Sequence, residues 1–357
     1  MPESEVLAPA SAAPCGQGAT AGLPRPWLVA DIGGTNARFG WLAEGDFGLS
    51  HVATLPAAGH PGPADAAAHY LAGLAQRLGS AYRPPSAAAF AVATAVGDDR
   101  IAFTNSGWAF SRREAQAALG LGTLLVLNDF EALALSLPRL QPNQVRAWPG
   151  SAVHAERASR SALAVIGPGT GLGVAGLVPT ADGSWVAVPG EGGHATLSAA
   201  DDFDAALLAA VSREHAHVSA ERLLSGIGLP VLHGAVAAVM GQTAALASAM
   251  PLTAELIVER GLNGQCAVCS RTLDAFCALL GSFAGNVALV LGARGGVYIG
   301  GGIVPRLGER FFHSAFRQRF EAKGRFQAYL QAIPTLLITD TLAALNGGVQ
   351  ALEQHRR

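Results

Sequence analysis

The stretch that decides the fold runs from Trp27 to Asn36 and reads Trp-Leu-Val-Ala-Asp-Ile-Gly-Gly-Thr-Asn. Its apolar run predicts a buried strand, its two glycines predict a tight turn, and the residues from Ala37 onward predict a second strand. The pattern returns at 162–178, where an apolar run precedes a turn with four glycines and another strand. Two such units, each opening a run of mixed strands and helices, predict two related α/β domains that face each other across a cleft.

The elements around these units set the expected domain boundaries. We expect a disordered tail at 1–26, a small α/β domain at 27–138 and a large α/β domain at 139–334. A final strand and helix at about 335–352 are expected to return to the small domain and complete it. Within the two domains the patterns predict helices at 64–78, 112–119, 201–214 and 271–291, and strands at 87–93, 124–127 and 296–299.

The composition favours a compact globular enzyme that acts on small molecules. Half of the 357 residues are apolar and 14% are charged, which is typical of a folded domain. The net charge of −2 lacks the excess of basic residues that nucleic-acid binding requires. We expect no nucleic-acid partner. Lys323 is the single lysine, so any mechanism that needs a positioned lysine has one candidate.

The remaining features of the composition indicate a cytoplasmic protein. The acidic N-terminus has neither the basic start nor the apolar run of a signal peptide. The longest apolar stretch is interrupted by Gly281, Gly285 and Asn286, so we expect no membrane span. The four cysteines are too few and too bunched for the disulfide framework of a secreted protein.

The turn at Asp31–Asn36 has the composition of an anion-binding site. Glycines such as Gly33 and Gly34 let the backbone N–H groups approach a phosphate, and Thr35 and Asn36 can add hydrogen-bond donors. Asp31 repels phosphate unless a cation lies between, so we expect Mg²⁺ to be held there partly through water. An ordinary hairpin turn is the alternative interpretation.

The second glycine-rich turn strengthens the nucleotide interpretation. Gly169, Thr170 and Gly171 lie at the centre of the seven-residue turn 167–173. The turn matches neither a dinucleotide fingerprint nor a Walker loop, and the lysine of a protein kinase is missing. The interpretation that remains is a nucleotide held between the two glycine-rich turns. Gly301 and Gly302, after a predicted strand, are candidates to lie against the adenine ring.

Several carboxylates occur where solvated surface is not expected. Asn128 and Asp129 end a predicted buried strand, and Glu191, His194 and Glu221 follow in glycine-rich or small-residue contexts. Anionic acceptors and an imidazole that converge on one point suit a polyol such as a sugar. For Asp129 the alternative is a helix N-cap, since the next segment is a predicted helix.

These residues resemble those of the bacterial glucokinases, in register from about Trp27 to Gly348. The resemblance rests on the segments 31–36, 128–129, 167–173, 191–194, 219–228 and 300–305. It implies the two-lobed actin-like ATPase fold, with a ribonuclease-H-like core in each lobe and the active site in the cleft between the lobes. It also implies ATP and glucose as substrates, Mg²⁺, and a homodimer, with Asp129 as the catalytic base. Asn128, Glu191, His194 and Glu221 would contact the glucose hydroxyls.

Two segments depart from the family pattern. Ala195–Leu197 replaces a bulkier segment that often carries an acid, and Thr94-Ala95 replaces a pair that contains proline in many relatives. These changes bear on sugar selectivity more than on the reaction. A kinase for another hexose, a paralogue without turnover and a sugar-sensing regulator are the competing functions, although the leader is too short and too poor in basic residues for a DNA-binding domain.

The pair Cys266 and Cys269 has the C-x-x-C spacing of a zinc site. Tetrahedral zinc needs two more ligands, and Cys277 alone is near in sequence. Reduced, partly buried thiols are therefore the expected state of these cysteines.

Overall fold

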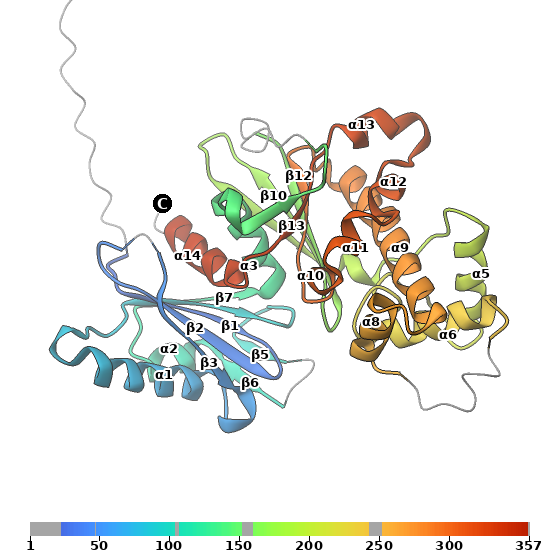
Figure 1. Ribbon diagram of the computed structural model, residues 1–357. Coiled ribbons are helices and arrows are strands. Elements are labelled where there is room, and N and C mark those ends of the chain that lie inside the picture. Colours follow the sequence, from blue (N-terminus) through green and yellow to red (C-terminus); the bar gives the residue numbers. More distant parts are fainter. Residues whose placement is uncertain (1–22, 47, 104–106, 152–159, 243–251, 356–357) are drawn as a thin grey trace, which may run out of the picture.

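The computed structural model describes residues 23–46, 48–103, 107–151, 160–242 and 252–355. Within these residues the chain forms two mixed sheets with helices between and around them (Figure 1). A two-stranded hairpin, β5 (Arg100–Ala102) with β6 (Ala109–Ser111), accompanies the first sheet. The short 3₁₀ helices cover 57–59, 79–81, 137–139, 142–144, 192–194 and 324–326.

The first sheet has the strand order β3-β2-β1-β4-β7. Alternate residues of β1 point to opposite faces, as the period of a strand requires: Leu28, Ala30 and Ile32 join one apolar cluster, and Trp27 and Val29 join another. The first cluster includes residues of α1 and α2. The elements are β1 (Trp27–Ile32), β2 (Asn36–Leu42), β3 (Ser50–Pro56), α1 (Pro63–Leu78), β4 (Ala87–Val92), α2 (Arg112–Ala118) and β7 (Thr123–Asn128).

The second sheet repeats this order and adds one strand, giving β11-β10-β9-β12-β13-β8. In both sheets the first three strands are antiparallel neighbours, and the next two join in parallel. The repeat confirms the predicted pair of ribonuclease-H-like cores. The strands are β8 (Val145–Ala147), β9 (Leu163–Pro168), β10 (Leu172–Pro179), β11 (Trp185–Gly190), β12 (Gly296–Ile299) and β13 (Thr335–Ile338).

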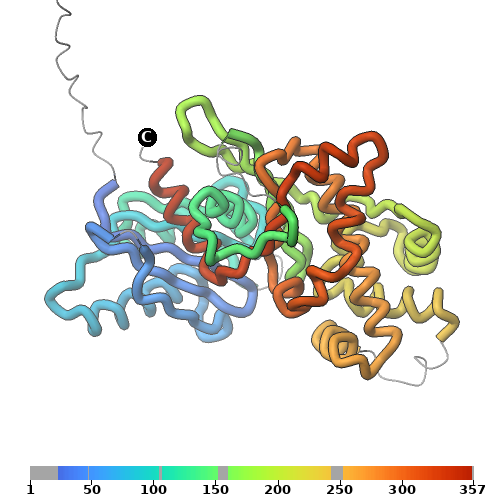
Figure 2. The backbone as a smooth tube through the Cα atoms, turned by 45° about the horizontal axis from the view of Figure 1, so that its top comes forward, coloured from blue at the N-terminus to red at the C-terminus, as the bar shows by residue number. Residues whose placement is uncertain are grey.

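Two helices, α3 (Asp129–Ser136) and α14 (Ala343–His355), lie between the sheets. Leu345 and Val349 of α14 pack on the first sheet with Trp27, whereas Ala343 and Ala351 join the core of the second sheet. Figures 1 and 2 both place the red α14 beside the green α3. The layers therefore alternate from helices to sheet, to the α3–α14 pair, to the second sheet and to the remaining helices.

The outer helices pack on the second sheet around α9 (Ala267–Leu291). A Cβ atom at Gly281 would lie 2.1 Å from the carbonyl oxygen of Phe316, so glycine is needed where α12 crosses α9. By length and apolarity α9 alone among the described helices could span a membrane, and 72% of its most apolar window is buried in the protein. The others are α5 (Asp202–Val211), α6 (Leu229–Val239), α8 (Ala254–Leu262), α10 (Val304–Leu307), α11 (Glu309–Phe312), α12 (Phe316–Glu321) and α13 (Gln327–Gln331).

The final strand does not return to the first sheet, so that part of the expectation for 335–352 is wrong. β13 pairs in parallel with β12, through Val297 and Thr335, and antiparallel with β8. The helix α14 does pack on the first sheet. The chain therefore crosses between the sheets immediately before α14.

The expected tail at 1–26 is too long at its C-terminal end. Leu23 packs against the cluster around Trp27, and the amide nitrogen of Ser86 donates to the carbonyl of Pro26 at 3.0 Å. Arg25 forms an ion pair with Glu353 of α14 at 3.4 Å. Residues 23–26 are thus part of the folded body, and residues 1–22 lie outside the described residues.

Candidate active site

Asn128 is the N-cap of helix α3, and Oδ1 of Asp129 accepts the backbone N–H of Phe130 at 3.0 Å. The Oδ1 atom of Asn128 accepts the N–H of Phe130 at 2.9 Å and that of Glu131 at 3.4 Å. Its Nδ2 atom donates to the carbonyl of Thr94 at 3.1 Å. The alternative interpretation of Asp129 as the N-cap is therefore wrong, because the preceding residue occupies the cap position.

Three carboxylates converge at Asp129. β1, β4 and β7 run parallel, with Ile32 level with Val92 and Val92 level with Asn128. Asp31 and Asp129 therefore leave the same sheet edge, roughly 10 Å apart across two strand spacings. Burial raises the pKa of Asp129 to about 6, with contributions in the same direction from the charge of Asp31 and, less strongly, of Glu191.

The surplus of negative charge at this point fits a cation. Burial raises the pKa of Asp31, and Arg38, its neighbour on β2, opposes that rise only in part. Lys323 cannot contribute, because its ammonium group donates to Ser282 and Asn286 of α9 within the helical layer. The donor set is made of carboxylate oxygens, the ligand type that Mg²⁺ prefers.

Three of the five residues expected to hold a sugar, Glu191, His194 and Glu221, lie together. The Nε2 atom of His194 lies 4.0 Å from Oε2 of Glu191 and 3.8 Å from Oε1 of Glu221. The side chains of His194 and Glu191 are 62% and 72% exposed, so both are open to a ligand. Glu221 is more enclosed, at 23% exposed. The structure thus brings this trio together, and the charge of Glu191 connects it to Asp129.

Backbone hydrogen bonds fix the positions of these three residues. The N–H of Glu221 donates to the carbonyl of Gly193 at 2.8 Å, and that of Ala220 donates to Ala195 at 2.9 Å. The Oε2 atom of Glu221 accepts the N–H of Leu172 at 2.8 Å. One carboxylate oxygen is therefore held by the β9–β10 turn, while the other faces the imidazole.

Packing accounts for part of the second glycine-rich turn. A Cβ atom at Gly167 would lie 2.4 Å from the ring of Phe130, and one at Gly173 would lie 2.0 Å from it. At Gly171 a Cβ atom would lie 2.5 Å from Oε2 of Glu221. These glycines therefore make room for side chains of the candidate site. Gly169 has open space around its Cα.

The three segments expected to hold a nucleotide fall into two groups. In the first turn the N–H of Gly33 donates to the carbonyl of Asn36 at 2.9 Å. Gly34 is half-buried, and Thr35 and Asn36 are exposed. This turn belongs to the first sheet and adjoins the carboxylate cluster through Asp31.

The other two segments adjoin each other on the second sheet. The N–H of Gly226 donates to the carbonyl of Gly169 at 2.7 Å. Thr170 is exposed at the tip of its turn. Gly301 has a φ of +74°, and a Cβ atom there would lie 2.3 Å from the carbonyl oxygen of Pro168. Gly302 is exposed, with open space around its Cα.

Sequence reasoning missed two residues that position the site. The ring of Phe130 joins the start of α3 to the β9–β10 hairpin, where it lies against Gly167 and Gly173. Thr94 was noted as a family departure, and its carbonyl holds the amide of Asn128. Gly167 and Gly173 are visible in the sequence, but the sequence does not show that the ring they make room for is that of Phe130.

A family model described as Glucokinase matches residues 28–355. The chain belongs to the glucokinase family. A glucokinase of Paramagnetospirillum magneticum is 47% identical over 320 residues, which cover 90% of this chain and 95% of that protein. A solved glucokinase from an Antarctic psychrotroph is 39% identical, with a TM-score of 0.82 over 92% of this chain and 99% of the other.

The wider fold extends to more distant structures. A ROK family glucokinase of Streptomyces griseus, solved with glucose and AMPPNP, has a TM-score of 0.62 at 19% identity and covers 92% of this chain and 100% of that one. At that identity the likeness concerns the fold. The glucokinase family and the two-lobed actin-like fold, both predicted from the resemblance, are confirmed.

Proposed function

We propose that the protein transfers the γ-phosphoryl group of ATP to the 6-hydroxyl of glucose, with Asp129 accepting the hydroxyl proton. Membership of the glucokinase family makes it an ATP-dependent glucose kinase. The observation that carries the mechanism is the raised pKa of Asp129, about 6 through burial and the charges of Asp31 and Glu191. A base with a pKa near the working pH combines ionisation with proton affinity.

The sugar is held by the groups that surround this base. Glu191 and Glu221 accept hydroxyl hydrogen bonds, and His194 between them donates or accepts. The remaining N–H of the Asn128 amide is directed by its bond to the Thr94 carbonyl. Support comes from the convergence of the imidazole and the two carboxylates within 4.0 Å. Charged acceptors of this kind hold a polyol more strongly than neutral ones.

The nucleotide lies between the glycine-rich turns of the two sheets. Its phosphates contact the first turn through Gly33, Gly34, Thr35 and Asn36, and the second turn through Gly169, Thr170 and Gly171. Gly301 and Gly302 contact the adenine. The support is the adjacency of the second turn to Gly301 and the exposure of Thr35, Asn36 and Thr170.

Mg²⁺ is the cation that would fit the carboxylate cluster, and Asp31 would hold it, partly through water. When bound, it neutralises the charge that develops on the phosphates during transfer. The chain's own residues do the rest: Asp129 takes the proton, and the sugar trio fixes the direction of the attacking hydroxyl. Without a lysine in this part of the described chain, backbone N–H groups supply the other phosphate contacts.

The two sheets move as lobes that close on glucose. We assign 27–138 with α14 to the small lobe, and 139–338 to the large lobe. Closure brings the first turn to the second and excludes water from the phosphate. Compaction in small-angle scattering on saturation with glucose is expected. We also expect a cytoplasmic homodimer, and a monomer at micromolar concentration in sedimentation contradicts the dimer alone.

A panel of sugars tests the proposed substrate. ADP release in a coupled assay is expected to have its highest kcat/KM with glucose, and to fall with mannose and fructose. Mannose differs from glucose in the direction of one hydroxyl, so selectivity against it depends on the geometry of Glu191, His194 and Glu221. Equal or higher kcat/KM with another hexose makes this a kinase for that sugar. No ADP release with any hexose in the presence of Mg²⁺ and ATP overturns the proposal.

A further inference from the structure

A histidine and two cysteines outside the active site form a compact cluster. His233 lies on α6, Cys266 is the N-cap of α9, and Cys269 lies in the first turn of that helix. The Nε2 atom of His233 and the two Sγ atoms all lie within 4.8 Å of one another. In Figure 1 these helices lie in the orange and yellow layer, away from the blue first sheet. The glucose kinase mechanism uses none of the three side chains.

The spacing of the three atoms suits one tetrahedral ion. With Zn–S bonds of about 2.3 Å and a Zn–N bond of about 2.0 Å, tetrahedral angles place sulfur and nitrogen ligands about 3.5 Å apart. The distance from Cys269 Sγ to His233 Nε2 is 3.5 Å. Two thiolates and an imidazole are the ligand types that zinc prefers over hard oxygen donors.

The surroundings favour the ligand forms of Cys266 and His233, whereas burial raises the pKa of the Cys269 thiol to about 12, so that its thiolate forms when a metal binds. The N–H of Cys269 donates to Sγ of Cys266 at 3.3 Å, and such a donor favours thiolate over thiol. His233 is 4% exposed, and burial favours the neutral imidazole that binds metals. Cys266 is half-buried, so the cluster opens to solvent on its side.

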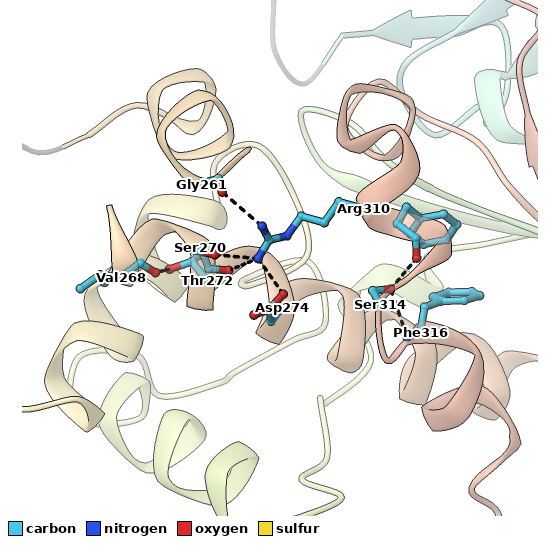
Figure 3. Close-up of polar contacts among 9 residues, drawn as sticks. Gly261, Val268, Ser270, Thr272, Asp274, Arg310, Ser314 and Phe316 are labelled. Carbon is cyan, nitrogen blue, oxygen red and sulfur yellow. Dashed lines mark hydrogen bonds and ion pairs between the residues drawn. The ribbon is translucent and has the colours of Figure 1, made fainter. Parts of the chain in front are cut away.

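A separate set of polar contacts makes the base of the cluster rigid. Arg310 of α11 reaches the first turns of α9, where its Nη2 atom lies 2.8 Å from the carbonyl of Ser270 and 2.8 Å from Oδ1 of Asp274. Its Nη1 atom donates to the carbonyl of Gly261 at the end of α8 (Figure 3). A Cβ atom at Gly261 would lie 2.9 Å from the carbonyl oxygen of Cys269. The helix turn that carries Cys269 is therefore held from two sides before any ion binds.

We propose that Nε2 of His233 and the Sγ atoms of Cys266 and Cys269 bind one Zn²⁺, with water in the fourth position beside Cys266. His233 is 36 residues from Cys269 in sequence, which is why spacing alone did not reveal it. Cys277 faces Ser314 instead and is not a ligand. Binding converts two thiols to thiolates and releases their protons to solvent.

The site joins α6 to α9 behind the sugar-binding loop. α6 begins at Leu229, directly after the segment that contains Glu221, and the N–H of Gly228 donates to Oγ of Ser225 at 3.0 Å. An ion that fixes His233 against α9 therefore anchors the helix that this loop leads into. The expected role is structural, with Zn²⁺ raising the melting temperature of the reduced protein.

Metal uptake by the full chain under reducing conditions tests the proposal. The tag-free protein is expected to contain about one zinc per chain by mass spectrometry. After chelation, Co²⁺ should produce thiolate charge-transfer and tetrahedral d–d absorption bands, which Zn²⁺ then removes. Cys266→Ser is expected to weaken Co²⁺ binding by more than about 100-fold, since even an outer partner of a ligand is worth 10–100-fold.

The matched control is Cys277→Ser, which alters a buried thiol outside the cluster and is expected to keep the bands. Circular dichroism confirms that each variant is folded. Wild-type protein that takes up neither metal after reduction overturns the proposal, even if a Cys266–Cys269 disulfide is found before reduction. Equal Co²⁺ affinity in Cys266→Ser and wild type overturns it too. Glucose kinase activity is not needed for either result.

Discussion

Replacing Asp129 with asparagine is expected to stabilise the free protein while it removes turnover. The folded state raises the pKa of this carboxyl from 3.8 to about 6. Ionisation therefore lowers the free energy of unfolding as pH rises from about 4 to about 6, and the loss is complete above that range. A shift of this size corresponds to about 3 kcal/mol at pH 7.

Asparagine keeps the shape and has no proton to lose. Asp129→Asn should therefore unfold at higher temperature than wild type, by roughly 4 °C at pH 7 for a chain of this size. The difference in free energy of unfolding between the variant and wild type, about 3 kcal/mol at pH 7, should fall to about 1.5 kcal/mol at pH 5 and vanish near pH 3. Calorimetry across this pH range, on the protein without substrates, measures it.

Turnover should change in the opposite direction. General-base catalysis contributes about 10²- to 10⁴-fold, and we expect kcat of Asp129→Asn to fall by the upper part of that range. The acid limb of kcat/KM, expected near pH 6 in wild type, should disappear. Glucose affinity by calorimetry should fall much less, because Glu191, His194 and Glu221 remain.

The control is Asp182→Asn, in the exposed turn between β10 and β11. Hydrogen bonds from Thr180 and Ser184 lower the pKa of Asp182, so this variant should gain no stability and keep its kcat. Near-normal kcat in folded Asp129→Asn refutes the role of Asp129 as the base. Unchanged stability at pH 7 refutes the electrostatic account of the site.

Three further substitutions, the first of them with a control variant, separate the parts of the site. Gly173→Ala places a methyl group 2.0 Å from the ring of Phe130 and should lower the free energy of unfolding, measured in urea, by about 1–3 kcal/mol. The control Gly234→Ala, in open space on a helix, should raise that free energy by about 0.5–1 kcal/mol. Equal stabilities of the two variants contradict the packing argument. Glu221→Gln should raise the KM for glucose by about 10- to 150-fold through the lost charged acceptor and leave the KM for ATP unchanged, and an unchanged glucose KM removes it from the sugar site. Asp31→Asn removes the negative charge that helps to raise the pKa of Asp129. The acid limb of kcat/KM should therefore move to lower pH, and a higher Mg²⁺ concentration should be needed for half-maximal rate. An acid limb that stays at the same pH contradicts the coupling of the two carboxylates.

Local sequence patterns predicted most elements of the fold because they depend on neighbours in the chain. The helix predicted at 112–119 begins at Arg112, and Oγ of its N-cap Ser111 accepts the N–H of Glu114 at 3.2 Å. The final strand expected from about residue 335 is present as β13, but it was expected to join the small domain and lies in the second sheet. A strand of four residues does not specify its partner, and the pairing of Thr335 with Val297 joins positions that lie far apart in the sequence.

The site shows the same division between local and long-range information. Asn128 and Glu131 form a capping box, a spacing that is visible in the sequence, although the alternative considered from the sequence placed the cap at Asp129. The place of Phe130 between Gly167 and Gly173 depends on the contact of two lobes. The pKa of Asp129 likewise depends on burial, and on Asp31 and Glu191 from other elements. The place of Phe130 and the pKa of Asp129 therefore depend on the assembled fold and cannot be predicted from local sequence.

The return of α14 to the first sheet has a consequence for biosynthesis. Leu345, Val349 and Leu352 complete the apolar cluster around Trp27, and Gly347 crosses the carbonyl of Ala132 where a Cβ atom would lie 1.6 Å away. Domains generally fold as units, the N-terminal one first, as they leave the ribosome. Here the first-made lobe lacks its closing helix until α14, which follows the second lobe in the sequence, has been translated. The nascent chain must therefore keep an unfinished apolar face in solution, or on a chaperone, while the entire second lobe is synthesised.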